Sequence, residues 1–196
     1  YPFVYLVAQS FSSDAAVSAG QVTFFPVDFT LDTYKYLLKD DSFFKYYGNT
    51  ILYTVVGTLI SVIGTALLAY PLSKPRLRLN KFFTPFVVFT MYFTGGIIPN
   101  YILVTQWLGL QDSMLAIILP GAISTFNLLV MKSFFAGLPE ELEEAASIDG
   151  MGVYGIFVKI ILPLSKPILA TMALFYMVGM WNEWFAPMMY LDSRED

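Results

Sequence analysis

Apolar residues form long runs along this chain, separated by short clusters of charge. The charge-free runs extend from Tyr46 to Ser73, Phe82 to Gln111, Ser113 to Met131 and Pro167 to Asn182. An α-helix rises about 1.5 Å per residue, so roughly 20 residues cross a hydrocarbon core of about 30 Å. Two runs are long enough, and a third reaches if it passes Lys132, whose stem can snorkel. The last run is short and stops at Glu183. The pattern predicts a membrane protein.

Helices are expected over about Asn49–Leu72, Phe82–Thr105 and Ser113–Phe135, with a further one beginning near Pro167. Residues 1–11 have the character of the outer end of a helix whose beginning is missing, and residues 13–45 are too polar to cross a bilayer. The first full helix carries a small residue every four positions, at Gly57, Ser61, Thr65 and Ala69. Such a stripe lets a neighbouring helix approach closely. We therefore expect an all-α helical bundle, one transmembrane domain over residues 1–196, present as a fragment.

Composition strengthens this prediction and excludes several kinds of chemistry. The chain is 57% hydrophobic and 13% charged, whereas soluble domains are roughly a quarter charged. The absence of Cys and His removes disulfides, thiol nucleophiles, Ser-His-Asp triads and zinc or haem sites built on these ligands. We expect no metal site and no cofactor bound by this chain. The net charge of −4 gives no indication of nucleic-acid binding.

The short loop Lys74–Lys81 carries four positive charges and no negative one. Short cytoplasmic loops have such an excess, so we place this loop inside the cell. A role in gripping anionic lipid would put it on the same side. By alternation, residues 13–45, residues 106–112 and the tail after Ala186 lie outside, and residues 137–166 lie inside.

Polar and helix-breaking residues within the apolar runs are candidates for a transport pathway. The third helix is interrupted near mid-membrane by Gly95, Gly96, Pro99 and Asn100, and broken helices at this depth often mark transport sites. A plain packing kink is an equal alternative. Asn127, in the fourth helix, either bonds a neighbouring helix or lines the pathway.

A second candidate group is Trp181, Asn182 and Glu183, at the end of the last apolar run. A carboxylate at the bilayer centre costs about 2.5–3.5 kcal/mol on insertion scales, so it normally faces protein or water. Aromatic rings beside amide and carboxylate groups suit sugars, which favours a pathway or gate. Anchoring at the membrane interface and contact with a partner are the alternatives.

The inner segment contains a short helix with its boundaries marked by sequence. Pro139 is expected in the first turn and Gly150 just past the end, where a left-handed or tight turn is expected. Glu140 and Glu141 lie where the helix dipole favours negative charge. Ala145 and Ala146 leave a low surface that another protein can approach. A second short helix is expected over Val153–Ile161, ended by Pro163.

The spacing of this segment resembles the EAA loop of ABC importer permeases. The residues that match are Glu144, Ala145, Ala146, Gly150, Ile160, Leu162 and Pro163. Lys166-Pro167 and Trp181-Asn182-Glu183-Trp184 are similar to the carbohydrate branch, which includes the second membrane subunit of maltose importers. "YFTGGIIPNY" and "ILPGAISTFN" are similar to permeases for aldouronates and other polysaccharide fragments.

The resemblance implies a type I ABC importer permease fold with six membrane helices, of which about five are present here and the first is partial. It implies a homologous second permease subunit, two ATPase subunits that hold ATP and Mg, and an extracytoplasmic solute-binding protein, in a bacterial inner membrane. The Glu140–Gly150 helix would be the coupling helix, with Asp149 beside its end and Glu144 meeting a basic residue of the ATPase. ATP-driven closure of the ATPases would then move the bundle between inward- and outward-facing states.

Other classes of function fit less well. The chain has no Walker motif, so nucleotide must be handled by another chain, and we expect no enzyme activity from this one. A membrane-embedded enzyme would have only Glu183 and the loop acids as catalysts, and a secondary transporter would lack coupling-ion residues in its spans. An ABC permease for a solute other than a sugar remains the main alternative.

Overall fold

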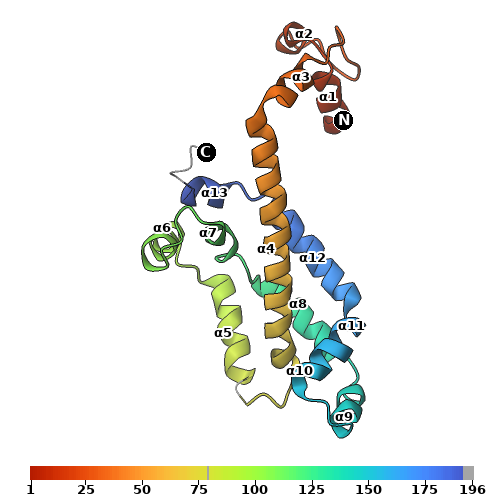
Figure 1. Ribbon diagram of the computed structural model, residues 1–196, viewed down its shortest axis with the longest axis vertical. Helices are drawn as coiled ribbons and strands as arrows, with labels where there is room; N and C mark the ends of the chain where they lie inside the picture. Colours follow the sequence, from red (N-terminus) through yellow and green to blue (C-terminus); the bar gives the residue numbers. More distant parts are fainter. Residues whose placement is uncertain (79, 192–196) are drawn as a thin grey trace. The chain divides into compact units, whose positions relative to one another are not determined.

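The computed structural model describes residues 1–78 and 80–191, and every regular element among them is a helix. The predicted all-α class is therefore confirmed. The first elements are α1 (Pro2–Ser10), α2 (Asp14–Ser18), α3 (Asp32–Lys39), α4 (Asp41–Ser73), α5 (Asn80–Tyr92), α6 (Ile97–Ile102) and the π-helix η1 (Leu103–Trp107). The others are α7 (Met114–Ile118), α8 (Thr125–Ala136), α9 (Glu141–Ile148), α10 (Val153–Ile156), the π-helix η2 (Phe157–Ile161), α11 (Leu162–Leu164), α12 (Lys166–Trp181) and α13 (Phe185–Tyr190) (Figure 1).

The chain divides into two compact units, Tyr1–Thr50 and Ile51–Asp196. The first unit has a small core of Ala8, Ala16 and Val22. Ser12 stabilises it, because its Oγ donates to the Ala8 carbonyl at 2.6 Å and accepts from the Val27 N–H at 3.1 Å. This side chain fixes the turn between α1 and the polar segment that follows.

The second unit is built around α4, which runs beside α8 and α12 (Figure 1). The predicted small-residue stripe is buried along α4: Ser61, Thr65 and Ala69 are fully enclosed. A Cβ added at Gly57 would come within 3.0 Å of Met180 Sδ. The packing interpretation of this stripe is confirmed, since only small residues leave room for α12 at this distance.

One helix is by itself long and apolar enough to cross a membrane, over Ser42–Ser73. Two bent pairs also qualify when each pair is counted together. They are Asn80–Tyr92 with Ile97–Trp107, bent by 113°, and Val153–Leu164 with Lys166–Trp181, bent by 80°. By length and composition, the described residues thus contain one helix that could cross a membrane, or three if each bent pair is one span.

The interruption predicted in the third apolar run is present, between α5 and α6. Gly96 adopts a φ of 86°, which glycine tolerates and other residues rarely adopt. Pro99 and Asn100 lie inside α6 rather than in the break. Proline is accommodated there because the first turn of a helix needs no hydrogen bond from its nitrogen.

The continuous fourth helix predicted over Ser113–Phe135 is wrong. The run divides into α7 and α8, with Leu119–Ser124 between them. Pro120 cannot donate a helical hydrogen bond, and Gly121 weakens the helix further. Ser124 then begins α8, accepting at its Oγ from the Asn127 N–H at 3.4 Å.

Candidate functional site

The helix predicted between Pro139 and Gly150 is α9, and its end has a defined capping geometry. Gly150 has a φ of 80°, which confirms the left-handed turn expected there. Its N–H donates to the Ser147 carbonyl at 3.1 Å, and the Met151 N–H donates to the Ala146 carbonyl at 2.9 Å. These two bonds form a Schellman motif. At the other end, Pro139 precedes the N-cap Glu140. The prediction that it lies in the first turn is therefore wrong.

One side of α9 packs into the core of the second unit. Ala146 is buried in the same cluster as Tyr70 of α4 and Phe157 of η2. The Tyr70 and Phe157 rings lie 4.9 Å apart between centroids. The small side chain of Ala146 lets α9 approach these rings closely. The burial of Ala146 therefore fixes the position of α9 against the end of α4.

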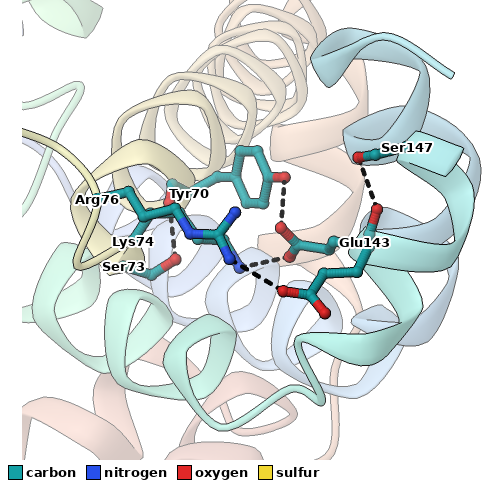
Figure 2. A network of polar contacts seen from close by, with 7 residues as sticks. Tyr70, Ser73, Lys74, Arg76, Glu143 and Ser147 are labelled. Atoms are coloured by element: carbon teal, nitrogen blue, oxygen red, sulfur yellow. Dashed lines mark hydrogen bonds and ion pairs between the residues drawn. The ribbon is translucent and has the colours of Figure 1, made fainter. Parts of the chain in front are cut away.

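A partly buried polar cluster holds α9 against the end of α4. Glu143 forms an ion pair with Lys74, and its Oε2 accepts from the Tyr70 hydroxyl at 3.2 Å (Figure 2). Lys74 Nζ also lies 5.1 Å from the centre of the Tyr70 ring, in cation–π geometry. Ser147 Oγ donates to the Glu143 carbonyl at 2.8 Å. Two side chains, Lys74 and Tyr70, therefore converge on the Glu143 carboxylate, and Ser147 bonds its backbone.

A second ion pair lies beside the first and is open to solvent. Arg76 Nη2 donates to Glu144 Oε1 at 3.0 Å, and the two side chains are 77% and 57% exposed. Glu144 was expected to meet a basic residue of an ATPase, whereas here its partner is Arg76 of the same chain. An exposed pair of this kind contributes about 0.2–1 kcal/mol, so it can exchange partners readily.

Between these elements lies an open groove of about 540 Å³. It is lined mainly by the end of α4, the basic loop and the faces of α9 and α10: Tyr70, Lys74, Arg76, Glu140, Glu143, Glu144, Ser147, Tyr154 and Phe157 are among its residues. Val153 and Tyr154 in its wall and Ile148 outside it expose large apolar side chains, with Ile148 87% exposed. Apolar residues this exposed at the tip of a polar segment are typical of a contact surface for another protein.

The predicted coupling residues fall into two groups. Glu144, Ala145, Asp149, Gly150 and Pro163 are exposed, whereas Ala146 is buried and Ile160 and Leu162 pack against the core. The second helix does not end before Pro163 as predicted: it continues through η2 and α11 to Leu164. The widened π turn changes the positions of the carbonyls that the proline ring would otherwise meet. The role of these residues in coupling stays a prediction.

Sequence reasoning missed Glu143, Tyr70, Lys74 and Arg76 as members of this site. The positive charges of the Lys74–Lys81 loop predict that this loop lies inside the cell, but by themselves they do not predict a contact with α9. The signal that could have found them is complementary charge, since a basic loop and an acidic helix were both placed on the inner side. Their residue-by-residue pairing depends on the fold.

A second cavity, of about 720 Å³, lies in the second unit among α6, α7, α12 and α13. Three of the predicted pathway residues line it, namely Asn100, Asn127 and Glu183. Its other polar groups are Thr94, Ser124, Tyr176 and Tyr190, and aromatic and aliphatic side chains complete the wall. Amide, hydroxyl and aromatic groups together can contact both the hydroxyls and the apolar faces of a sugar.

The remaining pathway candidates do not line this cavity. Gly95 lies in the α5–α6 break, where a Cβ added to it would meet Cβ of Pro99, in the first turn of α6, at 3.5 Å. The Asn182 side chain donates to the Val178 carbonyl of its own helix at 2.8 Å. Trp181 ends α12 and is partly exposed.

Glu183 has a structural contact that was not predicted. Its Oε1 accepts from the backbone N–H groups of Phe185 at 3.1 Å and Ala186 at 3.0 Å. It therefore caps the beginning of α13, where a carboxylate is favoured by the helix dipole. Among the described residues, no group of three or more His, Cys, Asp or Glu side chains could hold a metal ion.

Comparison with known proteins gives consistent matches. Residues 61–192 match the family described as binding-protein-dependent transport system inner membrane component. Protein LplC of Bacillus subtilis (strain 168) is 46% identical over 192 residues, covering 98% of this chain and 65% of LplC. The polygalacturonan/rhamnogalacturonan transport system permease protein YtcP of the same organism is 43% identical, covering 98% of this chain and 67% of YtcP.

A solved structure shows the same arrangement. One chain of the crystal structure of a bacterial ABC transporter involved in the import of the acidic polysaccharide alginate superposes with a TM-score of 0.93. It is 39% identical to this chain, and the match covers 98% of this chain and 69% of that one. The present chain thus spans about two thirds of the length of these three proteins.

Proposed function

This chain belongs to the family of binding-protein-dependent transport system inner membrane components, and on that premise we propose that it couples an ATPase to the import of oligosaccharides. The type I permease fold expected from the sequence is confirmed by the family match and by the alginate importer. The family consists of transport permeases of the bacterial inner membrane. In our proposal, several passes through that membrane carry the solute pathway, and ATP with Mg binds to separate ATPase subunits.

The observation that carries this proposal is that α9 is fixed to the rest of the chain on one side and exposed on the other. Its inner side is fixed by Ala146 and Glu143 to the end of α4, while Ala145 and Ile148 stay exposed. A helix that is fixed on one side and exposed on the other can be displaced by a partner. It then moves as a rigid body together with the helix to which it is fixed. We assign the exposed side to an ATPase subunit.

The complete importer would contain a homologous second permease subunit, two ATPase subunits and an extracytoplasmic solute-binding protein. The exposed apolar residues of α4, such as Leu59 and Ile63, are available for lipid or for the second permease. Hydrolysis of ATP by the separate subunits would drive the change between inward- and outward-facing states. This chain would perform no chemical step itself.

For the solute, we propose oligosaccharides that contain uronic acids. The support is that two similar proteins are named for acidic polysaccharides, polygalacturonan/rhamnogalacturonan and alginate. The 720 Å³ cavity is then a passage, with Asn100, Asn127 and Tyr176 as its hydrogen-bonding groups. Its described lining contains the Glu183 carboxylate and no Lys or Arg, so it would repel a uronate rather than retain it. Selection for acidic sugars therefore belongs to the binding protein and the second permease.

The test is reconstitution of the full-length subunit with its second permease, ATPases and binding protein in liposomes. We expect ATP-dependent accumulation of labelled oligogalacturonides and little accumulation of a neutral oligosaccharide such as maltotetraose. Accumulation of the neutral sugar alone would contradict the proposed substrate class. Accumulation without ATP, or ATP-driven import of a non-sugar solute only, would contradict the proposed function.

A further inference from the structure

The basic loop that follows α4 has a role beyond orienting the chain. Lys74 and Arg76, two residues apart, each reach a carboxylate of α9, on Glu143 and Glu144 respectively. Figure 2 shows Tyr70 and Lys74 directed at Glu143 from the end of α4. The two ion pairs are parallel links between the same two segments, but they differ in their surroundings.

Burial separates the two links. The Lys74 and Glu143 side chains are 20% and 18% exposed, whereas Arg76 and Glu144 are 77% and 57% exposed. Solvent screens an exposed pair strongly and a partly buried pair much less. Removing one partner from the partly buried pair also leaves the other charge with little solvent to compensate it. The Lys74–Glu143 pair is therefore the rigid link, and the Arg76–Glu144 pair is the exchangeable one.

Beyond Lys74, a chain of hydrogen bonds fastens the same loop to α5 and α8. Asn80 Nδ2 donates to the carbonyls of Leu72 at 3.0 Å and Lys74 at 3.2 Å, closing the end of α4. Thr84 Oγ1 donates to Asn80 Oδ1 at 2.8 Å, and Lys132 Nζ donates to Thr84 Oγ1 at 2.8 Å. The backbone at Lys74 is thus anchored to three helices. A displacement of Glu143 is therefore passed on to these helices and does not simply deform the loop.

We propose that Lys74 and Glu143 are positioning residues that fasten α9 to the end of α4, so that a displacement of α9 by the ATPase becomes a displacement of α4. This inference rests on the proposed function. Tyr70 supports the link by donating to the second oxygen of Glu143. Glu144 pairs with the exposed Arg76 and can change partners when the ATPase docks.

The experiment measures solute imported per ATP hydrolysed by purified complexes in liposomes. Lys74→Met and Glu143→Gln each break the link, and Tyr70→Phe removes only one hydrogen bond to Glu143. We expect the ratio to fall by about fivefold or more in the first two variants, the size of an ordinary coupling between sites. It falls less in Tyr70→Phe. Lys81→Met removes the same type of charge from an exposed position at the other end of the same loop and leaves the ratio unchanged.

The charge-reversed double variant, Lys74→Glu with Glu143→Lys, separates positioning from general damage. It restores opposite charges in the same place, so we expect an import-to-ATP ratio above that of either single variant, with ATPase binding retained in all of them. An unchanged ratio in both single variants overturns the inference, as does a double variant that assembles but couples no better than the singles. Failure of the unaltered complex to import any solute contradicts the proposed function instead.

Discussion

Gly150 ends α9 in a conformation that other residues adopt only with strain. Its φ of 80° lets the N–H groups of Gly150 and Met151 turn back to the carbonyls of α9. No heavy atom lies within 4 Å of a Cβ built at this position, so space is not the constraint. The constraint is the left-handed backbone, which sets the direction in which the chain leaves α9.

We predict that Gly150→Ala lowers the stability of α9 and reduces import. An L-residue in this region costs roughly 1–2 kcal/mol, which the last turn can relieve by unwinding. Gly152→Ala is the matched control, because Gly152 also has an open surrounding but an ordinary φ of −73°. Melting temperature and uptake of the two complexes would be compared. Equal behaviour of the two variants would show that the backbone at Gly150 is not a constraint.

Glu183 combines a cap of α13 with a charge in the cavity wall, and two substitutions separate these roles. Glu183→Gln keeps an acceptor oxygen for the N–H groups of Phe185 and Ala186 but removes the charge. Glu183→Ala removes both, with a loss of about 0.5–2 kcal/mol expected for a missing cap. We predict a lower melting temperature only for Ala, and faster import of acidic relative to neutral oligosaccharides for Gln. If Glu183→Gln left the preference between acidic and neutral oligosaccharides unchanged, the charge of Glu183 would have no role in the pathway.

At the scale of elements, the charge-free runs of the sequence correctly predict where the apolar helices lie, but only some of the positions where they break. The α5–α6 break could be predicted because Gly95 and Gly96 adjoin each other in an apolar run. The α7–α8 break was missed, although Pro120 and Gly121 mark it in the same way. Helix propensity alone does not decide between a kink and a full interruption, because neighbouring helices supply the missing hydrogen bonds.

Tyr176 supplies such a bond at the α7–α8 break. Its hydroxyl lies 2.7 Å from Thr65 Oγ1 of α4 and accepts from the Ser124 N–H at 3.0 Å. We predict that Tyr176→Phe destabilises the complex by about 1–3 kcal/mol, since it leaves buried polar groups without this partner. Tyr92→Phe, at a 74% exposed tyrosine, serves as control. Thermal unfolding of both variants measures the difference, and equal melting temperatures would contradict this role.

At the scale of the whole molecule, the polar cluster at α9 depends on contacts between residues that are far apart in the sequence. Periodicity and capping predicted α9 and its end at Gly150, because those signals are local. The pairing of Glu143 with Lys74 and Tyr70 joins residues 69 and 73 positions apart. No local pattern states which of several acidic residues in α9 faces the core. That choice follows from the depth at which Ala146 packs beside Tyr70 and Phe157.

Contact between α9 and an ATPase subunit is the most direct consequence of the proposed function. Ile148 is 87% exposed on α9, whereas Leu38, on α3, is 64% exposed in the segment predicted to lie outside the cell. A photoreactive amino acid placed at each position in the full-length subunit can report this contact in the assembled complex, without depending on cysteines in the partners. We predict a covalent adduct with the ATPase from position 148 and none from position 38. A complex that hydrolyses ATP and imports its solute, yet gives no ATPase adduct from position 148, would contradict the assignment of α9 as the coupling helix.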